Sequence, residues 1–385
     1  MAERSSGPHT RPGHRERSVN GILTHRQIRE LVERGALRAR RPLEPIQFQP
    51  TTLDLRLGPE ALEIGAGFLP ARGPVEEQVQ PLVRTRHDLS APEGAVLRRG
   101  HVYLIRLLED LALPAGLRAR CNPRSSTGRI DLFTRTVVDR HDRFDDVPEG
   151  YAGPLWLEVV PRSFDVRART GQRLNQVRVL AGRALVPDER LARRVVEDDL
   201  LPGAPAPVVH DASLLLGLSL QPDAPGRPIG WRARRSAPVL DLGLDAGHEP
   251  GDFFEPVAAE PDGTLRLQPE EFYLLASVAR LRIPPDLAAE MLPYDVGMGE
   301  LRTNYAGFFD PGFGWGRDSP HGARAVLEVR PHDVPFRVEH GQPIFRLQFS
   351  DTVEPADRLY GERGSAYQNQ GLALARYFRA AGARA

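Results

Sequence analysis

Two strand-like stretches decide the fold prediction: Leu155-Trp-Leu-Glu-Val-Val-Pro161 and, 170 positions later, Ala325-Val-Leu-Glu-Val-Arg-Pro331. Both are β-prone and both end at a proline. The same ungapped shift aligns Tyr103-Leu104 with Tyr273-Leu274, and further matches continue as far as Gln172. Self-similarity at one fixed offset is the sequence signature of a repeated structural unit. The chain is therefore predicted to contain two copies of one β-domain.

The composition supports short strands joined by turns. The 385 residues include 36 glycines and 36 prolines, which favours turn-rich β structure over a helical bundle. Segments such as Thr52–Leu57 and Val102–Leu107 alternate in the manner of strands and lie between Gly and Pro residues. Short helices are predicted at Thr24–Gly35, which has an N-cap Thr and a terminal Gly, and at Asp188–Asp198. The predicted fold class is mainly β, with two tandem β-barrels and a few short helices.

The predicted domain organisation has four parts. Residues 1–20 are polar and form a flexible tail. Residues 21–187 form the first β-domain and residues 208–385 the second. Between them, residues 188–207 provide a connecting helix followed by a Pro-rich linker.

Charge and residue usage exclude several classes of function. All 51 basic residues are arginines, so a Schiff-base lysine and a lysine-containing phosphate loop are impossible. The 51 acidic residues balance them, and no basic stripe is present, which argues against nucleic-acid binding. The single cysteine, Cys121, excludes an intrachain disulfide and a Cys-x-x-Cys zinc site. The polar start and the lack of a long apolar run predict a cytoplasmic protein without a membrane segment.

The two copies differ in complementary places. Copy one has Asn122-Pro-Arg-Ser-Ser-Thr-Gly-Arg129, where copy two has Leu292-Pro-Tyr-Asp-Val-Gly-Met-Gly299. Copy two has the turn-forming segment Tyr305–Gly314, where copy one has the charged stretch Asp139–Asp146. The charged stretch is interpreted as a solvated loop, with a metal site as the alternative. This division indicates one site shared between the copies.

Four features could carry chemistry, and each has a structural alternative. Arg124–Arg129 has two guanidinium groups and three hydroxyls that could bind an anion. The alternative is an ordinary polar turn. Glu158 and Glu328 lie in otherwise apolar strands, and a buried glutamate there would suit a general base. The alternative is a glutamate on the solvent face of a barrel strand. The turn residues of Ala306–Phe313 would let its backbone approach a flat ligand, with the Phe rings as apolar walls. The alternative is a structural hairpin whose phenylalanines belong to the core. Ser365–Gly371 is a polar tail, with ordinary fraying as the alternative.

Taken together, these segments resemble the dCTP deaminase branch of the trimeric dUTPase superfamily, in its long, duplicated form. The matching motifs occur in the family's order: Gln49–Gly58 as the early strand, Leu111–Leu117 as a lead-in, Arg124–Arg129 as the Ser/Arg motif, Ala306–Phe313 as the base-binding hairpin and Tyr367–Gly371 as the closing tail. The resemblance implies two dUTPase-like β-barrels.

The resemblance implies hydrolytic deamination of dCTP to dUTP and ammonia, in the supply of pyrimidine deoxynucleotides. It implies no zinc and no protein-bound cofactor, with Mg²⁺ carried by the triphosphate. A glutamate serves as general base, with Glu328 as first choice and Glu158 as second, while Ser125 and Arg129 position the water and support the base. The nucleotide-binding residues that it implies are Arg124, Ser126, Thr127, Ala306, Gly307, Asp310, Tyr367 and Gln370.

The expected ligand is dCTP, with dUTP or dTTP as product or inhibitor, and a homo-oligomer is left open. One alternative is a dUTP pyrophosphatase or a bifunctional deaminase, which would need Asp310 or Asp139 aimed at the α-phosphate. Another is a non-catalytic deoxynucleotide sensor. The retention of Ser125, Arg129 and Glu328 together argues against the sensor, because binding alone does not need groups that handle water.

Overall fold

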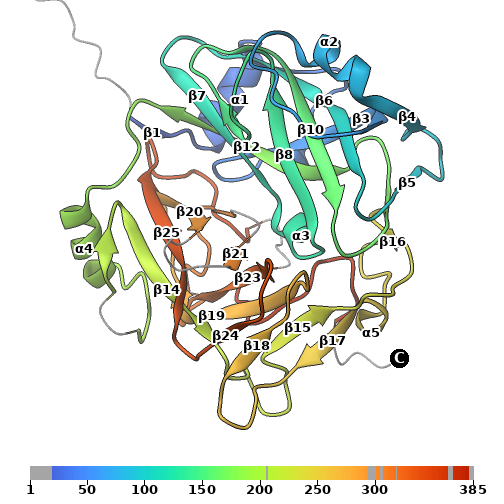
Figure 1. The fold of residues 1–385 in the computed structure, drawn as a ribbon. Helices are drawn as coiled ribbons and strands as arrows, with labels where there is room; N and C mark the ends of the chain where they lie inside the picture. The colour runs from blue at the N-terminus through green and yellow to red at the C-terminus, as the bar shows by residue number, and fades with distance from the viewer. Residues whose placement is uncertain are drawn as a thin grey trace, which may run out of the picture.

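The computed structural model describes residues 20–204, 207–293, 301–303, 307–317, 319–362 and 367–380. The chain forms two β units, which lie one above the other in Figure 1. We call residues 20–187 the first half and residues 208–380 the second half.

The first half is built on one ten-stranded antiparallel sheet. Its main path runs through seven strands in the order β8 (Leu132–Val138), β10 (Ala152–Pro161), β6 (Val102–Ala112), β3 (Leu53–Ile64), β12 (Arg173–Ala181), β7 (Leu117–Pro123) and β9 (Asp146–Val147). Three shorter strands pair with this path: β1 (Gly21–Ile22), β2 (Leu37–Ala39) and β4 (Val83–Asp88).

The second half repeats that strand order. The equivalent path is β21 (Leu301–Thr303), β23 (Ala323–Pro331), β19 (Tyr273–Leu281), β14 (Ser213–Ser219), β25 (Pro343–Asp351), β20 (Leu287–Pro293) and β22 (Phe308–Phe309). Strands β13 (Val209–His210), β15 (Gly230–Ala233) and β17 (Phe254–Val257) extend it. The bounds of β7 and β20, and of β12 and β25, differ by 170 positions, so the sequence offset corresponds to structurally equivalent strands. The prediction of a mainly β fold with two similar units is confirmed.

Small sheets and short helices complete the units. Strand β5 (Ala95–Leu97) pairs with β11 (Val166–Ala168), as β18 (Leu265–Leu267) pairs with β24 (Phe336–Val338). Strand β16 (Leu240–Asp241), from the second half, adds to β11 of the first half in parallel. The helices are α1 (His25–Glu33), α2 (Val75–Val79), α3 (Ser125–Gly128), α4 (Asp188–Glu197) and α5 (Pro250–Phe253), with 3₁₀ turns at Pro45–Gln47 and Gln80–Leu82.

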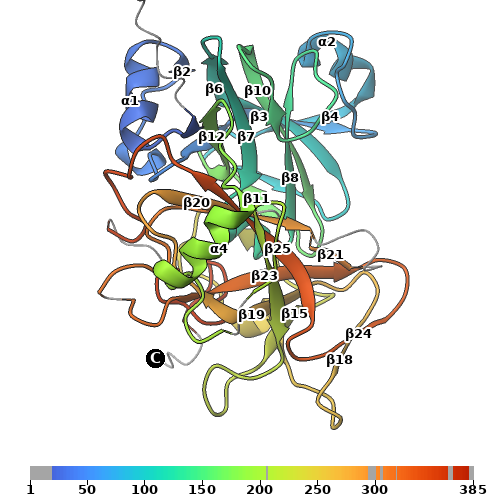
Figure 2. The same ribbon diagram turned by 90° about the vertical axis from the view of Figure 1, so that its left-hand side faces the viewer.

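Both predicted helices are confirmed. Helix α1 follows Thr24, whose backbone N–H donates to the side chain of Gln27 at 2.8 Å, and ends before Gly35, which has a φ of +69°. Helix α4 lies beside the second half (Figure 2), because Leu191 is buried in that half's core. Leu201, placed by the sequence in a linker, is also part of this core.

The two halves share apolar packing. The core of the first half includes Phe164, whose ring makes edge contacts with Phe253 and Phe254 of the second half at 5.3 and 5.4 Å between centroids. Cys121 is buried in this core, and burial raises the pKa of its thiol. Among the helices of the described residues, none has the length and apolar character needed to span a bilayer. The shared core fixes how the two halves face each other.

Candidate active site

The Ser/Arg motif forms one tight turn between two strands of the first half. Strand β7 ends at Pro123, and α3 occupies the next turn of chain. The Arg124 N–H donates to the carbonyl oxygen of Leu174 in β12 at 2.9 Å, and the Thr127 hydroxyl donates to the same oxygen at 2.8 Å. Ser126 and Thr127 are buried, whereas Ser125 is exposed. The turn is therefore anchored by two of its residues and presents Ser125.

The predicted base-binding hairpin lies in the second half. The Gly307 carbonyl accepts a hydrogen bond from the Met291 N–H at 2.9 Å, which joins the hairpin to β20. The turn continues through Gly312, whose φ of +95° favours glycine. A side chain at Gly312 would also meet the Tyr360 backbone nitrogen at 2.6 Å. Ala306, the residue predicted to recognise the pyrimidine, lies outside the described residues.

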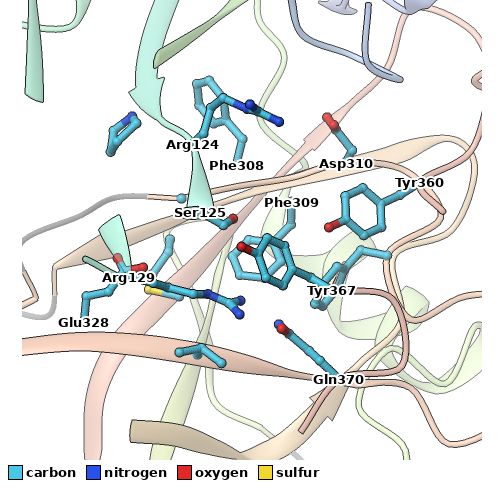
Figure 3. Close-up of a pocket in the computed structure, with 15 residues that line it drawn as sticks. Arg124, Ser125, Arg129, Phe308, Phe309, Asp310, Glu328, Tyr360, Tyr367 and Gln370 are labelled. Carbon is cyan, nitrogen blue, oxygen red and sulfur yellow. The ribbon is translucent and has the colours of Figure 1, made fainter. Parts of the chain in front are cut away.

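The motif and the hairpin meet at one cavity (Figure 3). The first half contributes Pro123, Arg124, Ser125 and Arg129. The second half contributes Met291, Gly307, Phe308, Phe309, Asp310, Phe313, Val326, Glu328, Tyr360, Tyr367 and Gln370. The structure thus brings together seven of the predicted site side chains together with Gly307. Ser126 and Thr127 do not line the cavity.

Glu328 reaches the Ser/Arg turn from β23. A Cβ on Gly128 would lie 2.6 Å from Glu328 Oε2, so only glycine permits this approach. The Glu328 side chain is 9% exposed, and burial raises its pKa to about 8. The Arg129 guanidinium opposes that shift, whereas Asp131 adds to it. A carboxyl group that titrates near neutral pH can accept and return a proton during turnover.

The C-terminal segment covers Arg129. The Arg129 guanidinium lies 3.9 Å from the centre of the Tyr367 ring, and its Nη1 donates to the Ala373 carbonyl at 2.9 Å. The Gln370 Nε2 donates to the Arg324 carbonyl at 3.1 Å. Arg129 Nε and Gln370 Oε1 are buried without a hydrogen-bond partner among the described residues. Buried polar atoms of this kind are costly unless a ligand satisfies them.

A buried carboxylate holds Arg124. Asp54 of β3 is fully buried, and its Oδ1 lies 3.2 Å from Arg124 Nε, while its Oδ2 lies 3.6 Å from Arg173 Nη1. Burial raises the pKa of Asp54, and the two guanidinium groups oppose that shift. Arg124 is thus oriented from behind, with its side chain 21% exposed at the cavity.

Asp310 is engaged by protein groups. Arg178 Nη2 lies 3.1 Å from Asp310 Oδ1, and the Thr51 hydroxyl donates to the same oxygen. The Arg178 guanidinium also lies 4.0 Å from the centre of the Phe308 ring. Asp310 therefore ties the hairpin to the first half.

Glu158 lies apart from this cavity. Its Oε1 accepts hydrogen bonds from Arg135 Nε and Nη2 at 2.9 and 2.5 Å, and its side chain is 2% exposed. A Cβ on Gly67 would lie 2.5 Å from its Oε2, so the loop after β3 covers it. The structure does not bring Glu158 to Ser125 and Arg129.

Sequence reasoning did not single out Asp54, Arg178 or Tyr360. Asp54 lies within the Gln49–Gly58 motif, but it alternates with leucines there, a pattern that favours a solvent-facing side chain, so its full burial had no sequence signal. Arg178 interrupts the apolar end of β12, Val177–Ala181, and that interruption was an available signal. Tyr360 had no sequence signal, because only the fold carries the C-terminal segment across the hairpin, where the Tyr360 N–H donates to the Pro311 carbonyl at 2.8 Å.

The charged stretch Asp139–Asp146 binds protein groups. Asp139 Oδ1 accepts from the Val75 N–H at 2.8 Å, and His141 Nε2 lies 3.0 Å from Asp146 Oδ2. In the part of the chain that the structure describes, no three His, Cys, Asp or Glu side chains are grouped as metal ligands.

Comparison with known proteins gives the same picture in both halves. Residues 19–183 match the family model of the 2′-deoxycytidine 5′-triphosphate deaminase (DCD) N-terminal domain, and residues 187–378 match that of the C-terminal domain. A crystal structure of 2′-deoxycytidine 5′-triphosphate deaminase from Agrobacterium tumefaciens superposes with a TM-score of 0.84 and 41% sequence identity, over 89% of this chain and 99% of that one.

Shorter relatives align with part of the chain. A dUMP-forming dCTP deaminase of Persephonella marina is 36% identical over 144 residues, which are 36% of this chain and 70% of the relative. The corresponding enzyme of Aquifex aeolicus is 31% identical over 158 residues, which are 40% of this chain and 79% of the relative. The chain belongs to the dCTP deaminase family and is an enzyme of that family, which confirms the resemblance found in the sequence.

Proposed function

We propose that this enzyme deaminates dCTP to dUTP and ammonia, with Glu328 as the base that activates water. The observation that carries the proposal is the approach of the Glu328 carboxyl to Gly128, inside a cavity shared with Ser125 and Arg129. Glu328 takes a proton from water as the oxygen attacks C4 of cytosine, and returns it to the departing amino group. One water is consumed and one ammonia is released.

The surrounding residues have distinct proposed roles. Ser125 and Arg129 hold the water and the developing charge at the ring, and Arg124 binds phosphate as a preoriented guanidinium. Phe308 and Phe309 bound the cavity on the hairpin side. The Mg²⁺ ion arrives with the triphosphate as part of the substrate. The chain lacks the cysteine pair of zinc deaminases, which supports a reaction without zinc.

A second candidate is deamination followed by release of pyrophosphate, because several relatives are named as dUMP-forming. That step needs a carboxylate to direct water to the α-phosphate. The two acids considered from sequence are both engaged by protein donors: Asp310 by Arg178 and Thr51, and Asp139 by Val75. This engagement favours dUTP as the product.

Product analysis with metal control tests the proposal. Chelator-treated enzyme returned to Mg²⁺ is expected to release ammonia and dUTP in equal amounts, with no gain from added Zn²⁺. Glu328→Gln and Ser125→Ala are expected to lose ammonia release while still binding dCTP. Equal amounts of dUMP and pyrophosphate would establish the second candidate, and a requirement for zinc would refute the proposed chemistry.

A further inference from the structure

A buried ion pair crosses between the halves directly behind the candidate site. Arg330 Nη2 binds the carboxylate of Asp131, and the Ser163 hydroxyl donates to Asp131 Oδ2 at 2.6 Å. Arg330 Nη2 also lies 3.2 Å from Ser163 Oγ. The exposed fractions of Arg330, Asp131 and Ser163 are 2%, 0% and 8%. The pair is thus sealed from solvent and joins two separate β units.

Each partner is two residues from a side chain of the site. Arg330 follows Glu328 on β23, so the two side chains share one face of the strand. Asp131 follows Arg129, and its N–H donates to the Gly128 carbonyl at 2.9 Å. The ion pair therefore connects the strand that carries Glu328 to the turn that carries Gly128 and Arg129.

The 170-residue repeat shows that this pair is specific to one interface. The position equivalent to Arg330 in the first half is Val160, and the position equivalent to Asp131 in the second half is Leu301. Neither charge is thus a general feature of the domain. A buried ion pair is weak evidence for stability, since desolvation offsets much of the attraction, but it can specify one arrangement of the groups that it joins.

We propose that Asp131 and Arg330 are positioning residues, which fix the second half against the first so that Glu328 faces Gly128 and Arg129. The proposal rests on the role of Glu328 proposed above. The pair acts through alignment and through charge, because Asp131 lies close enough to affect the proton affinity of Glu328 while Arg330 neutralises it. Neither residue lines the cavity, so neither touches substrate.

The charged surroundings of Glu328 make the two partners distinguishable. Arg129 lowers the pKa of Glu328 and Asp131 raises it. Opposite Glu328 on β19 lies the apolar Leu274, and Glu270, which lies 3.7 Å from Arg330, is 61% exposed and so contributes little. Removing the Asp131 charge should therefore lower the pKa of Glu328. Removing the Arg330 charge should raise it, because the Asp131 charge is then no longer neutralised.

Asp131→Asn, Arg330→Gln and the double variant test this, with the pH profile of ammonia release from dCTP as the readout. Each single variant is expected to lose on the order of tenfold to a hundredfold in kcat. The acidic limb of the profile should move to lower pH in Asp131→Asn and to higher pH in Arg330→Gln. The double variant should return the limb close to its original position and recover part of kcat.

Limbs that move in the same direction, or do not move, would reduce the pair to a structural contact and overturn the proposal. Should a single variant fail to fold, Ser163→Ala removes only one hydrogen bond to Asp131. The acidic limb of the pH profile of Ser163→Ala should move to higher pH, because the Asp131 carboxylate has lost one donor that offsets its charge. An unmoved limb would overturn the proposal. Failure of the proposed function is separately visible, because Glu328→Gln would then remain active in the otherwise unaltered enzyme.

Discussion

Glu158 and Glu328 occupy the same position of the repeat, on β10 and β23, yet their neighbours differ. The Glu158 carboxylate accepts two hydrogen bonds from Arg135 of its own half. Glu328 lies against Gly128 of the other half, and none of the described residues hydrogen-bonds to its carboxylate. The equivalent strands β10 and β23 both carry a glutamate at this position. The segment that packs against the glutamate differs: it contains Gly67 in the first half and Gly128 at Glu328.

The cover over Glu158 comes from the loop between β3 and β4. Gly67 of this loop lies against Glu158, and the Arg140 N–H donates to the Gly73 carbonyl at 3.2 Å. Helix α2, within the same loop, packs Val75 and Val79 on the first half. In the second half, the equivalent face meets the Ser/Arg turn. The same position of the fold is thus a buried glutamate bound to an arginine in the first half, and a cavity-lining glutamate in the second.

Neutralising each glutamate in turn is expected to give the largest difference between the two halves. Glu328→Gln should reduce kcat by about 10³-fold or more, because no other described carboxyl group takes its place at the turn. Glu158→Gln should leave kcat within about twofold and cost about 1–2 kcal/mol of stability through its weakened bonds to Arg135. Ammonia release and thermal unfolding measure the two effects. An inactive Glu158→Gln that still folds would reassign the site.

The matched glycines give the second contrast. Gly128→Ala places a methyl group within 2.6 Å of the Glu328 carboxyl, so that carboxyl must move and kcat should fall about 100-fold. Gly67→Ala makes the equivalent collision with Glu158 and should lower stability by about 1 kcal/mol without changing kcat by more than about twofold. Steady-state kinetics with thermal unfolding separates the two. Equal losses of kcat would contradict the assignment of Glu328 alone.

The pH profile tests the state of Glu328. Its pKa is raised to about 8, so the carboxyl is mostly protonated at pH 7 and the basic form grows as the pH rises. The value of kcat/KM should therefore climb about tenfold per pH unit below this pKa and level off above it. The γ-phosphate of the substrate also titrates, so dCTP binding to Glu328→Gln over the same pH range serves as the control. A flat kcat/KM after this correction would exclude Glu328 as the base.

The smallest expected effect concerns the C-terminal cover of the cavity. Tyr367→Ala removes the ring over Arg129 and should raise the KM for dCTP about tenfold, with a smaller change in kcat. Tyr367→Phe keeps the ring and loses only the hydroxyl that accepts the Arg376 N–H at 3.1 Å, so its KM should change by less than about threefold. Equal KM values for both variants would show that the ring does not contribute.

Local patterns in the sequence were enough to predict the strands of both units, helix α1 and a site shared between the halves. Alternating apolar segments, turn residues and the 170-residue offset predicted the strands of both units, because side-chain periodicity and turn chemistry act over short stretches of chain. The cap at Thr24 predicted α1 for the same reason. The positions of the Ser/Arg motif and the hairpin, on different halves, also predicted a shared cavity. The sequence offered two glutamates for it and could rank them only by resemblance.

The neighbours of each of these residues depend on how the chain packs in three dimensions. The tertiary structure placed Glu328 beside Gly128, paired Glu158 with Arg135, and buried Ser126 and Thr127. These outcomes depend on contacts between residues far apart in the chain, and such contacts leave no periodic pattern in the sequence. The Asp131–Arg330 pair is the clearest case, since its partners are 199 positions apart and become neighbours only when the two halves pack together.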